Sequence, residues 1–157
     1  MAFKFVSSAG SVHEPAVISL PGSGVIKPNS VVIFDVSTNA VSVAASTTAT
    51  GTSIVGVSLD YIQGKNEPTS FVRVIPFVPG QLWEADVLNV IATVQLLNRF
   101  RLYDSVTVEN TSYDQSLSIT GVFWCLGISG ASTGSAKVIG TFLKDTRHST
   151  NSTNEFR

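Results

Sequence analysis

The chain has 157 residues, about the length of one domain, and a net charge of −1 from 10 Lys and Arg against 11 Asp and Glu. This balance gives no basic patch of the kind that nucleic-acid-binding domains carry, and no apolar run approaches the roughly 20 residues of a membrane helix. One cysteine excludes an intrachain disulfide, and with only two histidines it excludes a four-ligand Cys and His zinc site within one chain.

Charged residues are scarce, at 13% of the chain against about 25% in typical soluble domains. Two explanations fit this scarcity: strands rich in Val, Ala, Ser and Thr, or a surface that is partly covered by partners. The first residues, Met1 to Val6, lack the basic and apolar regions of a secretory signal.

The first half of the chain carries short β-branched and aromatic runs that are separated by turn residues. Residues 31–36 and 40–45, joined by the polar residues 37–39, predict a β-hairpin. Further strands are predicted over residues 16–20, 54–59, 71–75 and 81–87, and the glycine-containing stretches 21–24 and 63–66 are typical of turns.

The segment 87–97 differs, because its apolar residues follow a helical period without an intervening proline or glycine. It predicts a short helix or helical turn, although its β-branched residues also favour a strand. Strands then resume over residues 100–103, 105–108, 117–128 and 136–142. The run 117–128 is apolar on both faces, which predicts a fully buried central strand.

Short strands at regular spacing predict an all-β fold, an antiparallel β-barrel or β-sandwich, with one short helix or helical turn near 87–97. No repeat of fixed length is visible. We divide the chain into an N-terminal arm (1–10), a single β domain (11–143) and a polar C-terminal tail (144–157), which we expect to order on assembly.

Residues with catalytic or metal-binding chemistry are few, and each has a structural explanation. Glu84 and Asp86 share one face of a predicted strand, where they could bind a cation, but solvent or a neighbouring surface is the better expectation. Cys125 lies in the most apolar run and is expected to be a buried thiol. A catalytic histidine needs a nucleophile and an orienting acid beside it, and the sequence places no such pair next to His13 or His148. We therefore predict no enzyme activity and no cofactor.

Aromatic and basic residues alternate only in the stretch 99–103. Such a mixture can bind single-stranded nucleic acid, but the charge of the whole chain argues against this partner. A strand with a core face and a charged outer face is the alternative, in which Arg101 pairs with Asp104 or Glu84.

The chain carries six short segments in a characteristic order, namely residues 31–35, 54–57, 80–87, 99–105, 106–110 and 138–142. This order resembles that of small structural proteins of tailed phages and prophages, over about residues 11–143. The resemblance implies a β-barrel or β-tulip-like domain that decorates the outside of an icosahedral capsid as a cement protein, commonly as a homotrimer bound to the major capsid protein. Such a protein would be made in the host cytoplasm and would end on the virion. A carbohydrate- or receptor-binding β-sandwich of a phage tail or fibre is the alternative.

The candidate interface residues are aromatic side chains and one arginine, since these types dominate interface energetics. Phe3 and Phe5 are expected to grip a neighbouring subunit, unless this terminus is frayed. Further anchors are Trp83, Phe100, Arg101 and Tyr103, with burial in the core as the rival expectation for Trp83 and Phe100.

Overall fold

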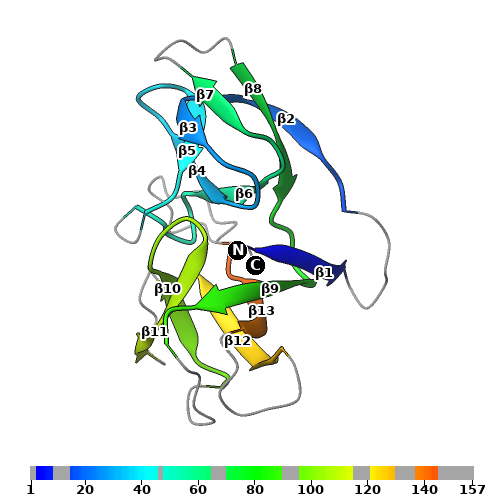
Figure 1. Cartoon of the computed structure of the whole chain (residues 1–157), viewed down its shortest axis with the longest axis vertical. Coiled ribbons are helices and arrows are strands. Elements are labelled where there is room, and N and C mark those ends of the chain that lie inside the picture. Colours follow the sequence, from blue (N-terminus) through cyan, green and yellow to red (C-terminus); the bar gives the residue numbers. More distant parts are fainter. Residues whose placement is uncertain are drawn as a thin grey trace, which may run out of the picture.

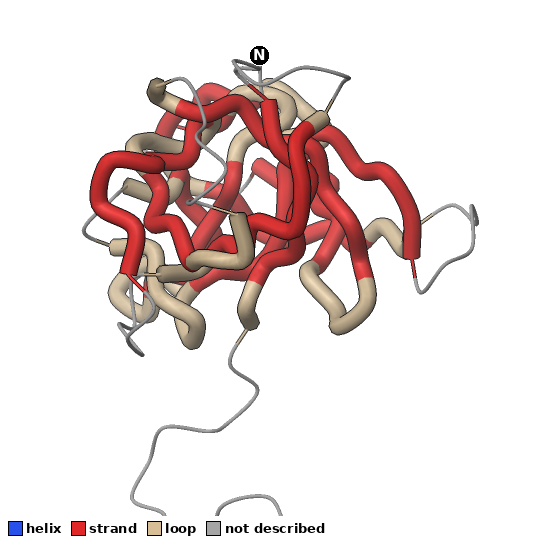
Figure 2. Tube along the Cα trace, turned by 90° about the horizontal axis from the view of Figure 1, so that it is seen from below, coloured by secondary structure: helices blue, strands red, loops and turns tan. Residues whose placement is uncertain are grey.

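The computed structural model describes residues 3–8, 15–45, 48–64, 70–89, 96–114, 121–129 and 137–144. Over these ranges the chain is all-β, built from strands and loops without a helix (Figure 2). The predicted fold class is therefore confirmed, and the choice left open between barrel and sandwich falls to the barrel.

The first barrel forms the upper part of the molecule in Figure 1. Its strands are β2 (Ile18–Gly22), β4 (Val31–Asp35), β5 (Ala40–Val43), β6 (Ile54–Ser58) and β8 (Ser70–Pro76). They close in the order β2-β5-β4-β6-β8, with β8 returning to β2. The predicted hairpin is confirmed as β4 and β5, and Asn39, at a φ of 52°, ends its turn in the left-handed conformation that Asn tolerates.

The second barrel lies below the first in Figure 1. It comprises β9 (Gln81–Val87), β10 (Arg99–Leu102), β11 (Thr107–Asp114), β12 (Phe123–Ile128) and β13 (Lys137–Phe142). Their sheet runs β9-β11-β10-β12-β13, and an additional antiparallel pairing of β13 with β9 closes it into a ring.

The two barrels have the same topology. In each, the first strand pairs in parallel with the third (β2 with β5, β9 with β11), and the third pairs with the second. The second then pairs with the fourth, the fourth with the fifth, and the fifth with the first. The chain thus repeats one five-strand arrangement without a visible sequence repeat, because pairing order depends on the apolar faces of the strands and not on matching residues.

One continuous core joins the barrels. The interior side chains of the second barrel pack against residues of β4, β6 and β8, including Val31, Ile54 and Ile75. The first barrel also has a smaller core of its own, centred on Val32 and Val72. Because both barrels contribute to one buried cluster, we expect them to unfold together.

Strand β1 (Lys4–Ser8) adds to the second barrel by pairing with β9. Just before it, Phe3 is 1% exposed and packs between the barrels against the rings of Phe123 and Phe142, while its backbone N donates to Asn29 O at 3.3 Å. Residues 3–8 of the predicted arm are therefore part of the folded chain, where they tie the first barrel to the second.

Two very short strands close the outer end of the first barrel. They are β3 (Gly24–Ile26) and β7 (Ile62–Gly64), which pair antiparallel and overlap the ends of the stretches 21–24 and 63–66 that were predicted as turns. Ile26 and Ile62 point from this small sheet into the barrel core. The pairing joins residues almost forty positions apart in the sequence, so no local sequence pattern predicts it.

Two predictions need correction or lie partly outside the described residues. Of the fully buried strand predicted over 117–128, residues 117–120 lie outside the described residues, and the prediction is wrong for β12: Phe123 and Cys125 are buried, but Trp124 and Leu126 are exposed at 39% and 36%. Among the strands of the described ranges, none forms a second layer over the outer face of the barrel there. The helix predicted over 87–97 falls mainly on residues 90–95, which are outside the described residues; Val87 ends β9, and Leu97 lies in a turn with a φ of 62°.

Candidate interaction surfaces

The predicted aromatic anchors divide between core and surface. Trp83 and Phe100 are buried within the chain at 1% and 0% exposure, which supports the core alternative for both. Phe3 is equally buried, and the partly buried Phe5 packs edge-on against Trp83, with ring centroids 5.4 Å apart. In the isolated chain these four side chains contact their own core, and they offer little surface to a neighbour.

Arg101 and Tyr103 are exposed, as an interface role requires. The Arg101 Nε donates to Glu109 Oε2 at 2.5 Å on the neighbouring strand, which raises the pKa of the guanidinium. The predicted pairing with Asp104 or Glu84 is therefore wrong, because the β10–β11 register places Glu109 opposite Arg101. Tyr103 is 52% exposed just after β10.

The acidic pair Glu84 and Asp86 does share one face of β9, as predicted, but a lysine already lies between the two carboxylates. Lys137 Nζ is 3.4 Å from Glu84 Oε1 and 3.3 Å from Asp86 Oδ1. The Ser129 hydroxyl donates to Glu84, and this bond together with Lys137 holds the pKa of Glu84 below its usual value. The lysine supplies the positive charge that a bound cation would bring.

Cys125 is a buried thiol, as predicted, and burial raises its pKa to about 11. His13 and His148 lie outside the described residues. Within the described part of the chain, no group of three or more His, Cys, Asp or Glu side chains is arranged to hold a metal ion. The described residues also contain no helix that is long and apolar enough to cross a membrane.

A first exposed surface lies on the outside of the first barrel, where Asp60, Tyr61, Phe71 and Arg73 define what we call the barrel surface. Phe71 and Tyr61 are 62% and 58% exposed. Asp60 accepts hydrogen bonds from the Arg73 backbone N at 2.9 Å and from its Nη2 at 2.6 Å, and these bonds lower the pKa of Asp60. The contact ties together the two segments that carry the exposed rings.

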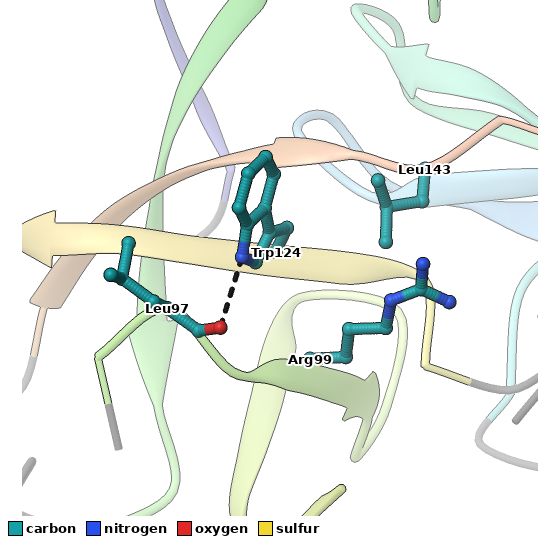
Figure 3. Close-up of a pocket in the computed structure, with 4 residues that line it drawn as sticks. All are labelled: Leu97, Arg99, Trp124 and Leu143. Carbon is teal, nitrogen blue, oxygen red and sulfur yellow. Dashed lines mark hydrogen bonds between the residues drawn. The ribbon is translucent and has the colours of Figure 1, made fainter. Parts of the chain in front are cut away.

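A second exposed surface is a pocket on the outer face of the second barrel, with a volume of about 350 Å³. Leu97, Arg99, Trp124 and Leu143 line this β12 pocket, and Figure 3 shows the Arg99 side chain extending toward Leu143. The indole Nε1 of Trp124 donates to Leu97 O at 3.1 Å, which fixes the ring at the pocket wall.

Neither surface was identified from the sequence. Tyr61 and Phe71 lie near strand ends, and Trp124 lies in a run that is apolar on both faces. Whether these side chains are exposed depends on which face of each strand the rest of the fold covers. Residues 123–126 are all apolar, so their sequence gives no sign of which face is exposed. Comparisons with protein families, curated proteins and solved structures find no match to the chain.

Proposed function

We propose that this chain is a non-enzymatic structural protein of a phage virion, which decorates the outside of an icosahedral capsid and stabilises it by bridging major capsid subunits. The proposal includes a homotrimer as the attached unit. The observation that carries it is the barrel surface: two exposed aromatic rings and an arginine, held on a rigid barrel. These are the residue types that dominate binding energy when they are buried between proteins.

The construction of the fold also supports this role. Two barrels joined through one core form a rigid body with surfaces facing in different directions, as a bridging protein needs. A trimer would carry three copies of each surface, so that weak contacts with several capsid subunits would add up through effective concentration. The low charge of the chain agrees with surfaces that become covered on assembly.

The oligomeric mass of the purified full chain tests the proposal first. We expect a species of three times the 16.6 kDa chain mass, which binds to capsids assembled without this protein. A strict monomer that ignores such capsids would refute the proposal.

A pair of variants then tests the barrel surface. Phe71→Ser should weaken capsid binding by about tenfold or more, as is usual for an interface aromatic. Val36→Ser is the matched control, because Val36 is 84% exposed in the β4–β5 turn and lies outside the barrel surface. Equal binding by both variants would exclude the barrel surface as the contact.

A carbohydrate- or receptor-binding module of a phage tail or fibre is the second candidate, favoured by the same exposed rings of Tyr61 and Phe71, since sugars stack on such platforms. Binding on a glycan array that is lost in Phe71→Ser, without capsid binding, would favour this candidate. Capsid binding with a silent array would favour the first.

A further inference from the structure

Among the described residues, the β12 pocket is lined by two leucines, a tryptophan and an arginine. Leu97, Trp124 and Leu143 supply the apolar wall, and Leu97 is 64% exposed. Arg99 is the cation, and no hydrogen bond or ion pair joins its side chain to another residue in the described part of the chain. At about 350 Å³ the pocket lies within the usual range of ligand sites, roughly 300–1,000 Å³. The pocket is therefore expected to bind an apolar group that has a negative charge next to it.

The chain itself continues from the wall of this pocket. Leu143 is a lining residue, and its backbone N donates to Val122 O at 2.8 Å. The next residue, Lys144, is anchored to the first barrel, because its Nζ donates to Thr52 O at 3.0 Å and to Ile54 O at 2.5 Å. Leu143 and Lys144, the last described residues, are therefore both held by hydrogen bonds, and Leu143 lies at the pocket wall.

The sequence of residues 145–157 contains an apolar and an acidic side chain side by side, as the lining of the pocket requires of a ligand. Phe156 is the one apolar side chain among these thirteen residues, and Glu155 precedes it directly. From Leu143 to Phe156 the chain can extend to about 40 Å, and as a flexible coil it spans roughly 20 Å, so it can turn back to the pocket without strain.

We infer that the β12 pocket is a docking site for the C-terminal segment of the same chain, in which Phe156 packs against Leu97, Trp124 and Leu143, and Glu155 faces the Arg99 guanidinium. The contact covers apolar surface on the second barrel that would otherwise face water. It gives the segment 145–157 a defined place on the folded chain, independent of any capsid.

The tether favours the segment of the same chain over that of a second copy. A short flexible connection gives an effective concentration in the millimolar range, well above the micromolar concentration of other copies in solution. A contact made by one aromatic ring and one ion pair is weak between separate molecules, but it is largely formed at such an effective concentration.

Acrylamide quenching of tryptophan fluorescence in the full chain tests this inference. Trp83 is 1% exposed and Trp124 is 39% exposed, so the quenchable signal belongs to Trp124. Phe156→Ser should raise the quenching constant by about 1.5-fold to twofold, because the tethered contact is then lost. Thr153→Ser, a small change in the same segment, is the matched control and should leave the constant unchanged. A quenching constant in Phe156→Ser equal to that of the unsubstituted chain would overturn the inference.

Charge reversal tests the ion pair and excludes a simple folding effect. Arg99→Glu should raise the quenching constant, and the double variant Arg99→Glu with Glu155→Arg should restore it. Failure of this restoration in a protein with an unchanged circular dichroism spectrum would overturn the pairing. The constant of the unsubstituted chain should stay the same from about 1 to 100 µM, whereas a rise on dilution would show that the segment docks on a second copy.

Discussion

A close backbone approach in the second barrel provides the sharpest test of its closure. A Cβ built on Gly140 of β13 would lie 2.2 Å from Trp124 O and 2.6 Å from the nearest Phe123 ring carbon on β12. An ordinary contact begins near 3.4 Å, so Gly140→Ala must push the two strands apart by more than 1 Å. Backbone oxygen cannot move aside as the end of a flexible side chain can.

The cost follows from what that displacement breaks. Separating β12 from β13 at this point loses one or two ladder hydrogen bonds, at about 1 kcal/mol each, and adds an overpacking strain of about 1–3 kcal/mol. We expect a loss of about 2–4 kcal/mol in the free energy of unfolding. For a chain of this length the thermal midpoint should fall by about 5–15 °C.

Gly127→Ala in the neighbouring strand β12 is the matched control, because a Cβ at Gly127 meets none of the described residues within 4 Å and the residue has no positive φ. It should leave the midpoint unchanged or raise it by up to a few degrees, since alanine restricts the unfolded chain. Thermal unfolding followed by circular dichroism measures both variants. Midpoints within about 2 °C of each other would refute the close approach, and with it the β12–β13 packing described above.

Three further predictions concern the core and its titrating groups. Phe3→Ala should lower the free energy of unfolding by about 3–5 kcal/mol in urea denaturation, since the ring is buried between the barrels, and a loss below about 1 kcal/mol would show that this residue is frayed. The Cys125 thiol, with a pKa of about 11, should react with a thiol reagent at pH 8 only after unfolding, and fast labelling of the native chain would contradict its burial. The pKa of the Glu84 carboxyl is lowered in the folded chain. Its contribution to stability is therefore present above the unfolded pKa near 4.5 and is lost as the pH falls through the folded pKa. The free energy of unfolding of Glu84→Gln should lack this part of the pH dependence, and a pH dependence equal to that of the unsubstituted chain would show that the Ser129 and Lys137 contacts do not form in solution.

The sequence predicted the strands well where one face is apolar and a turn residue follows. The β4–β5 hairpin and β9 were found with nearly correct bounds, because alternation and local turns define them. Strands β3 and β7 were missed, since glycines and a distant partner leave no local periodicity. Strand β1 was predicted as an extended arm, because its pairing partner β9 lies far along the chain and is not evident from the sequence near Phe3 and Phe5.

The candidate surfaces were harder to predict than the fold. Trp83 and Trp124 both lie in apolar strands, yet one is buried and the other is exposed, because Trp83 points into the shared core whereas Trp124 lies on the opposite face of β12 from the buried Phe123 and Cys125. The acidic pair was correctly placed on one face of β9, but the neutralising Lys137 comes from a strand fifty residues later. In each case the missing information is which strands are neighbours, and a single sequence does not contain it directly.

Binding to capsids tests the proposed function most directly. Purified full-length chain is added to phage capsids assembled without it, the capsids are sedimented, and the bound chain is quantified as its concentration rises. The account predicts saturable binding in multiples of three, together with capsids that withstand a higher temperature before they lose their DNA. Sedimented capsids that carry no bound chain at any concentration, with an unchanged thermal midpoint, would contradict it.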